Sequence, residues 1–300
     1  MKKSTQFFSN TNSVTIVLTF FALWLAVFFD QGVENGLAYF SILTFGILHG
    51  ANDLKLIQRS TYDAKKRSRF YLILARYVGV VLGGFMLFYV LPSFAFLVFI
   101  LVSAYHFGEQ HWLSKLKQVT FWGISFFTLY GLFVLFLLFY VHTAEVSTVI
   151  FKITGHVLTK DRFALVLWVT GVLGVAVYLL LWYRKGIKTN VLKQLFFLLV
   201  FFVVFNTASL LWSFAIYFVL WHSLPSMVHQ IEYLYGSFTK KSMLLYLKAS
   251  FIYWLLAALV SGSLLYVFRN DSDTALSLFI PFLAAITFPH VFVINRMNHH

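Results

Sequence analysis

Residues 129–141 read LYGLFVLFLLFYV, and this run decides the fold class of the chain. A helix of a soluble protein carries a polar stripe that faces water, whereas this run has no charged residue. The whole 300-residue sequence continues the pattern, with 60% hydrophobic, 20% aromatic and 11% charged residues and a mean hydropathy of +0.82. A soluble domain would need about twice that charged fraction to cover its surface. The sequence therefore predicts an all-α, polytopic transmembrane helix bundle.

Apolar segments long enough to cross about 30 Å of hydrocarbon recur along the chain. We expect about ten spans, with eight or nine still open, because the segment at 191–206 is short and is set off from the next by Asn206. The N-terminal MKKSTQFFSN has the charge layout of a signal sequence, but no small-residue cleavage site follows, so we expect a retained first span. No low-complexity tract or short repeat divides the chain, and we treat residues 1–300 as a single integral membrane domain. The predicted segments are residues 14–30, 36–54, 71–91, 93–113, 119–141, 163–183, 191–206, 208–231, 243–268 and 275–295.

The basic residues predict how these spans are oriented. A formal net charge of +13 would indicate a nucleic-acid partner for a soluble protein, but here the lysines and arginines belong to loops, and we expect no nucleic acid. With both termini in the cytoplasm, 17 Lys and Arg fall on the cytoplasmic side and 4 on the other. The strongest anchor is DLKLIQRSTYDAKKRSRF at residues 53–70, a topology determinant that would lie against anionic membrane lipid.

Histidines inside the spans are the candidate functional residues. The chain has no cysteine, which excludes disulfides, thiolate ligands and iron–sulfur clusters, so any metal must be held by histidine and carboxylate. His49, His106, His222 and His290 lie 13 to 15 residues into four predicted spans that all run towards the cytoplasm. At 1.5 Å per residue they reach a common depth, about 20 Å from the outer ends. A histidine in a span is costly without a partner, so four at one depth indicate a shared metal site.

Polar and helix-bending residues flank these histidines. Asp53 and Glu109 each follow one of the histidines by about one turn, so each carboxylate could orient a ligand, the alternative being that both face interfacial water. Pro225 and Pro289 lie beside the other two and can free backbone carbonyls. The remaining histidines are expected nearer the cytoplasmic rim (His111 and His229), in an outer loop (His142 and His156) and at the C-terminus (His299 and His300).

An all-imidazole site in an aromatic setting suits iron(II), copper or zinc, and residue spacing does not choose among them. Neutral ligands leave the metal its positive charge, and an open coordination position on ferrous iron would bind O2. Zinc would favour hydrolysis, for which Glu109 is the one nearby candidate base. The 37 phenylalanines fit an apolar tunnel for a long hydrophobic substrate, although lipid contact and helix packing draw on the same residues.

Four short motifs occur in order at these segments: HGAND at His49, YHFGE at His106, WHS at His222, and PH followed by an apolar residue at His290. In this ordered set the chain resembles the bacteriorhodopsin-related protein-like (Brp/Blh) family of β-carotene 15,15'-dioxygenases, from the second to the tenth predicted span. The resemblance implies a multi-pass enzyme of the bacterial inner membrane that uses Fe(2+) and O2 to cleave the central double bond of β-carotene into two all-trans-retinal molecules. It also implies a functional link to a retinal-binding rhodopsin.

The resemblance also assigns ligands. Three of the histidines correspond, position by position, to iron ligands of the family: His49, His106 and His222. The family pattern has a further histidine four residues after the one in the WHS motif, where this chain has Ser226. We expect His290 as the fourth metal ligand, with His229 as the alternative and a three-histidine site completed by water also open.

Two other functions remain open from the sequence. A histidine-rich membrane desaturase or hydroxylase would hold two irons on closely spaced HxxxH and HxxHH clusters, which this sequence lacks. A transporter, or an assembly factor for a retinal-binding pump, would use the intramembrane histidines as a proton or metal relay.

Overall fold

The computed structural model describes residues 2–60 and 67–298, and within these ranges every regular element is a helix apart from an isolated bridge between Leu116 and Ile187. The prediction of an all-α protein is confirmed. The expectations for Lys65, Lys66, His299 and His300 lie outside the described residues. In chain order the elements are α1 (Lys2–Phe28), α2 (Gln31–Ser41), η1 (Ile42–Gly46), α3 (Ile47–Gly50), α4 (Asp53–Ser60), α5 (Arg67–Val90), α6 (Pro92–Trp112), η2 (Leu113–Lys115), α7 (Phe121–Val141), α8 (Thr143–Thr154), α9 (Lys160–Tyr183), α10 (Val191–Thr207), α11 (Leu210–Ala215), η3 (Ile216–Ser223), α12 (Leu224–Tyr235), α13 (Lys240–Val267) and α14 (Ser272–Asn298).

All the predicted apolar segments are helical, but they are not equivalent. Within the described residues, seven helices or joined helices are long and apolar enough to cross a membrane, so the chain is a multi-pass membrane protein. The apolar parts of α1 and α10, Ser13–Phe28 and Val191–Thr207, are shorter. The predicted span 36–54 consists of α2, η1 and α3 and is interrupted by a turn before α4. The count of ten spans therefore stays a prediction.

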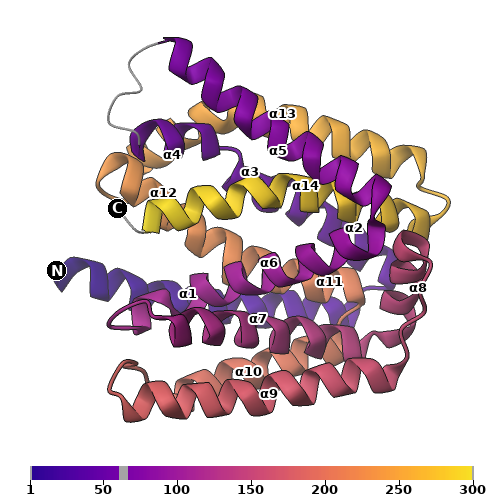
Figure 1. Cartoon of the computed structure of the whole chain (residues 1–300), viewed down its shortest axis with the longest axis horizontal. Coiled ribbons are helices and arrows are strands. Elements are labelled where there is room, and N and C mark those ends of the chain that lie inside the picture. Colours follow the sequence, from indigo (N-terminus) through magenta and orange to yellow (C-terminus); the bar gives the residue numbers. More distant parts are fainter. Residues whose placement is uncertain (1, 61–66, 299–300) are drawn as a thin grey trace.

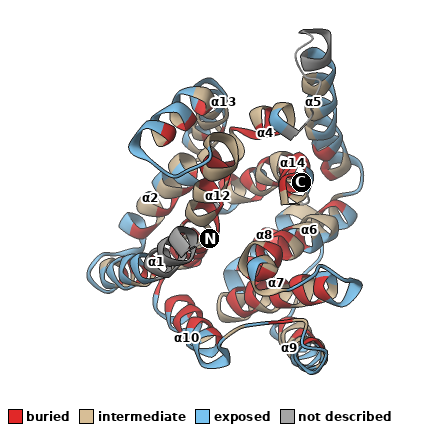
Figure 2. Ribbon diagram, turned by 90° about the vertical axis from the view of Figure 1, so that its left-hand side faces the viewer, coloured by how far each residue is buried: buried red, intermediate tan, exposed pale blue. Residues whose placement is uncertain are grey.

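The outer surface of the bundle is apolar. Figure 2 shows exposed residues along the outward sides of α5, α9 and α13, with buried residues turned towards the other helices. Large side chains such as Trp168 and Leu192 are 73% and 77% exposed. A surface of this kind would aggregate in water, whereas hydrocarbon solvates it at no cost.

α6 and α7 pack with their backbones in contact, because glycine stands at both crossing points. A Cβ added to Gly108 would lie 1.9 Å from the carbonyl oxygen of Phe127, and one added to Gly131 would lie 1.9 Å from that of Ala104. Small residues at helix crossings are a common basis of packing in membranes, where apolar burial itself gains little. These two glycines fix α6, which carries His106, against the bundle.

Two segments of π-helix interrupt the helices that carry histidines. η1 ends three residues before His49, and η3 contains His222. A π-turn changes the direction of the side chains that follow it relative to an α-helix, and such turns are frequent at functional sites. Pro225, expected to bend the helix, is the second residue of α12, which continues directly from η3. The irregular backbone expected near His222 is therefore present as this π-helical segment.

A further helix lies where the sequence analysis expects an outer loop between residues 141 and 163. α8 is 12 residues long, about 18 Å, which is too short to span a bilayer. Figure 1 shows α8 at one end of the bundle and both chain termini at the opposite end. The shared side of the two termini agrees with the predicted topology, and which side of the membrane that is stays a prediction.

Candidate metal centre

Four separate elements bring histidines to one place inside the bundle. His49 comes from α3, His106 from α6, His222 from η3 and His290 from α14. All four side chains are buried, between 1% and 6% exposed. The four histidines that the sequence analysis places at one depth are thus brought together by the fold, although 241 residues separate the first from the last.

The four imidazole rings form a closed quadrilateral. Ring centroids lie 4.7 Å apart for His49 and His290, 5.2 Å for His290 and His106, 4.7 Å for His106 and His222, and 5.2 Å for His222 and His49. Neighbouring rings stand nearly perpendicular, at 78° to 90°. The four rings therefore surround one common space.

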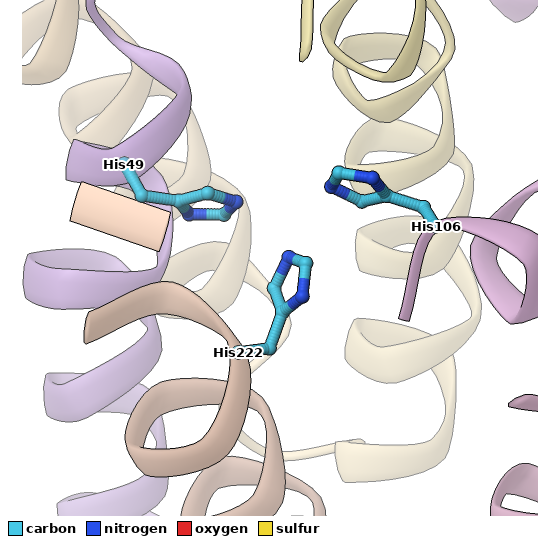
Figure 3. Close-up of side chains that lie close together, drawn as sticks. All are labelled: His49, His106 and His222. Carbon is cyan, nitrogen blue, oxygen red and sulfur yellow. The ribbon is translucent and has the colours of Figure 1, made fainter. Parts of the chain in front are cut away.

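Ring nitrogens converge within that space. His49, His106 and His222 each offer one nitrogen, and these three atoms lie within 4.8 Å of one another. Figure 3 shows the three imidazoles pointing towards one another from different helices. With bonds of about 2 Å, two imidazole nitrogens on one metal ion lie at most about 4 Å apart, so these three nitrogens could hold a single ion after at most a small movement of the rings.

Several of these nitrogens have no partner. Both ring nitrogens of His106, both of His222, and Nε2 of His290 are buried without a hydrogen bond to any described residue. Each unsatisfied buried polar atom costs about 1–3 kcal/mol. Concentrating such atoms at one point is costly for a structural core, and one shared ligand could satisfy several of them at once.

Asp53 orients His290 from the side away from the cluster. Nδ1 of His290 donates to Oδ1 of Asp53 at 2.8 Å, and the hydroxyl of Tyr77 on α5 donates to Oδ2 at 2.9 Å. Asp53 is 1% exposed, so it does not face interfacial water. Because Nδ1 is occupied, the free Nε2 of His290 is the atom available to a metal. Tyr77 is a residue that sequence reasoning missed, since nothing in its surroundings links it to Asp53.

Glu109 lies close to His106 without bonding to it. Its Oε2 is 3.9 Å from Nδ1 of His106 and has no hydrogen-bond partner, while Oε1 accepts from the hydroxyl of Tyr105 at 3.0 Å. Asn295 of α14 donates to the same hydroxyl at 3.2 Å. Glu109 is also 1% exposed, which excludes the alternative of an interfacial position. A small movement of the carboxylate would bring it into bonding distance of His106.

Aromatic rings and one close glycine hold the remaining two histidines. Nδ1 of His49 bonds to the carbonyl of Gly46, so its Nε2 faces the cluster. Phe218 stacks on His222 with centroids 5.7 Å apart at 14°, and Phe107 meets the same ring edge-on at 4.7 Å. A Cβ on Gly46 would lie 2.7 Å from Phe218, so only glycine permits this contact. The surroundings of the nitrogens are therefore largely apolar.

Position 226, where the family pattern has a histidine, belongs to a different polar group. Ser226 is 1% exposed, and its Oγ accepts from Gln230 at 3.1 Å. Gln230 in turn accepts from the hydroxyl of Tyr246 at 2.8 Å. Neither His229 nor His290 belongs to the group of three converging nitrogens. The His290 ring lies 4.7 Å and 5.2 Å from two rings of that group, and among the described residues no such ring contact is found for the half-buried His229 of α12. His111 is half-buried, and one of its ring nitrogens is satisfied by a bond to Gln194 at 2.8 Å.

A cavity of about 460 Å³ adjoins the four histidines, all of which line it. This volume lies within the range of small-molecule sites, about 300–1,000 Å³. Its other walls are mainly aliphatic and phenyl side chains from α6, α7, α8, α11, α13 and α14. Leu256 and Val260 of α13 line the cavity and are 58% and 56% exposed, so the cavity reaches the lipid-facing surface there.

A family model described as Beta-carotene 15,15'-dioxygenase matches residues 40–298 of the chain. The chain belongs to this family. The matched range includes all four clustered histidines and every described element from η1 to α14, so the resemblance carried by the four motifs is confirmed. No curated protein and no solved structure matches the chain.

Proposed function

We propose that the chain is an Fe(2+)- and O2-dependent dioxygenase that cleaves the 15,15' double bond of β-carotene to give two molecules of all-trans-retinal. Membership of the family supports the reaction. The observation that carries the metal assignment is the set of buried imidazole nitrogens without partners beside an apolar cavity. One O2 supplies the oxygen atoms of both aldehydes, so the reaction needs no other reductant or oxidant.

The donor set fits ferrous iron. His49, His106, His222 and His290 would hold it through neutral imidazoles, a ligand type that suits iron. Iron held by neutral ligands keeps its positive charge and would supply the redox chemistry that joins O2 to a carbon–carbon double bond. The proposal takes His290 as the fourth ligand because its ring lies 4.7 Å and 5.2 Å from two of the others, whereas His229 is outside the cluster.

The protein side chains would prepare and shield this site. Asp53 holds the proton of His290 on Nδ1, and the carbonyl of Gly46 does the same for His49, so the Nε2 lone pairs are free for the metal. Phe107 and Phe218 cover His222 and exclude water from its surroundings. Water exclusion protects a reactive centre from side reactions.

An apolar substrate could reach this site without leaving the bilayer. The cavity is lined mainly by aliphatic and phenyl groups and meets the lipid-facing surface at Leu256 and Val260. Carotenoids dissolve in hydrocarbon, so the opening on α13 is the proposed route of entry. The enzyme would work in the bacterial inner membrane with its termini in the cytoplasm, and its retinal would serve a retinal-binding rhodopsin.

Purified protein loaded with ferrous iron and supplied with β-carotene in air tests the proposal. We expect retinal as the product, detected by chromatography and mass spectrometry, and none when O2 is removed. A loaded, folded protein that binds iron but leaves β-carotene intact would contradict it. Iron taken up without product, together with uptake of metal into proteoliposomes, would favour the transporter instead.

Single substitutions test the ligand set independently of turnover. In His49→Ala, His106→Ala and His222→Ala we expect loss of bound iron, measured as iron per chain after removal of free metal. His111→Ala is the matched control, because this half-buried histidine bonds to Gln194 away from the cluster. Retention of iron in the three variants, or two irons per wild-type chain, would overturn the single-site assignment.

A further inference from the structure

α8 has two chemically different sides. Val146, Val149 and Ile150 are buried, between 3% and 6% exposed, and follow the i, i+3, i+4 spacing of one helix face. Glu145 and Lys152 are exposed on the other side. A short helix of this kind lies in the plane of a membrane interface rather than crossing it.

The apolar face of α8 closes one end of the cavity. Val146, Val149 and Ile150 all line it. Figure 1 shows α8 across the end of the bundle opposite the termini. The neighbouring lining residues come from the same ends of α6, α7 and α14: Phe96, Phe139 and Leu276.

The arm of the cavity between the histidines and α8 has a defined length. On α14 both Leu276 and His290 line it, and 14 residues of helix correspond to about 20 Å. On α6 the lining runs from Phe96 to His106, about 15 Å. The lining residues of this arm therefore span a length comparable with half of an extended carotenoid, with α8 at the far end.

α8 is held firmly enough to act as a wall. Nζ of Lys152 lies 3.0 Å from Oδ1 of Asp271 and 3.0 Å from Oγ1 of Thr274, which ties α8 to the start of α14. Gly155 ends the helix in the left-handed conformation, at φ 74°. These exposed polar contacts add little energy, but with the packed apolar face they fix the position of the helix.

We infer that the apolar face of α8 is the end-stop that determines which carotenoid end group is accepted and which double bond lies beside the histidines. The inference rests on the proposed function, because it assigns the cavity to a carotenoid. A ring seated against Val149 and Ile150 would place one particular bond at the cluster, and the length of the arm rather than any polar contact would select it. This explains how a site lined by apolar groups measures position along a uniform polyene.

Substitutions on α8 test the end-stop in two directions. The double variant Val149→Ala/Ile150→Ala lengthens the arm, and Ile150→Phe shortens it. The matched control is Phe151→Ala, which makes a larger deletion on the same helix at a side chain that is 52% exposed and does not line the cavity among the described residues. Folding of each variant is checked by monodispersity and iron content, which we expect to equal those of the wild type.

Binding to metal-free protein is the primary measurement, since it does not require catalysis. The probes are β-carotene and lycopene, whose open-chain ends reach further than the rings of β-carotene. In the lengthened variant we expect the ratio of lycopene affinity to β-carotene affinity to rise by about tenfold or more. One extra or missing methylene group in an apolar pocket changes affinity by a factor of this size. Ile150→Phe should weaken β-carotene binding, and Phe151→Ala should match the wild type.

The outcomes separate the inference from the proposed function. Equal affinity ratios in the lengthened variant, Phe151→Ala and wild type would overturn the end-stop, even if the wild type makes retinal. Binding that responds to α8 without any cleavage would refute the dioxygenase and leave the end-stop standing. With iron, Ile150→Phe should give unequal aldehydes from β-carotene, because its central bond can no longer reach the histidines.

Discussion

Replacing Asp53 by alanine removes the carboxylate that holds His290. In the wild type this carboxylate accepts from Nδ1 of His290 at 2.8 Å and from the hydroxyl of Tyr77 at 2.9 Å. Without it, the imidazole can rotate and can carry its proton on Nε2, the atom proposed to bind iron. We therefore expect Asp53→Ala to keep the fold but to bind iron less tightly than the wild type.

The magnitude follows from these contacts. Loss of a residue that orients a ligand histidine typically weakens metal affinity by about 10- to 100-fold, or about 1.4–2.8 kcal/mol. The variant also leaves the Tyr77 hydroxyl and His290 Nδ1 buried without a partner, at about 1–3 kcal/mol each in protein stability. The second effect is present in metal-free protein, so the two can be measured separately.

Two measurements separate these effects. Competition against a series of chelators gives the iron affinity, and the melting temperature of metal-free protein in detergent gives the stability. Tyr77→Phe is the matched control, because it removes one bond to Asp53 and keeps the bond to His290. We expect Asp53→Ala to lose iron at least tenfold more readily than Tyr77→Phe. Equal iron affinity in Asp53→Ala and wild type would refute the role of this carboxylate.

Three further predictions concern packing, access and pH. Gly131→Ala should destabilise the protein by about 3 kcal/mol or more, since its Cβ would lie 1.9 Å from the carbonyl oxygen of Ala104; a melting temperature equal to that of wild type would contradict the backbone contact. Leu256→Trp should lower kcat/KM for β-carotene while iron content stays unchanged, and an unaltered rate would exclude entry at α13. Hydrogen bonds from the hydroxyl and backbone N–H of Thr274 hold the pKa of Asp271 below its usual range, with Lys152 contributing. Because the folded-state pKa is depressed, this stabilisation exists above the ordinary carboxyl pKa and fades as pH falls below about 4. Asp271→Ala should therefore melt below wild type at pH 7, with a gap that closes on acidification; a gap that persists in acid would contradict the assignment.

Topology can be measured directly because the chain has no cysteine. A cysteine introduced at Gly155, beyond α8, should react with a membrane-impermeant thiol reagent added outside intact cells. One introduced at Lys188, between α9 and α10, should react only after the membrane is opened. Labelling of both from the same side would contradict the predicted orientation.

The sequence predicts the bundle and the meeting of the histidines because both depend on regular geometry. Apolar length determines which segments are helices, and a constant rise per residue places side chains at a common depth. Depth, however, does not say which way a side chain points. The direction of the His222 side chain depends on the π-helix of η3. The residues of this segment, Ile216–Ser223, carry no pattern that predicts a π-turn.

Contacts between distant helices could not be predicted from one sequence. Tyr77 meets Asp53 because α5 packs beside α4 and α14, and Tyr105 meets Asn295 through a similar coincidence. α8 escaped prediction because its 12 residues are amphipathic and too few for a span. The two contacts between helices depend on tertiary packing, which a hydropathy pattern does not encode.

The most direct test of the central claim measures iron content and product on the same purified sample. The samples to compare are wild type, His290→Ala and His229→Ala. We predict one iron per chain and retinal formation in wild type and in His229→Ala, and loss of both in His290→Ala. The reverse pattern, with His229→Ala losing iron and His290→Ala retaining it, would contradict the four-histidine centre.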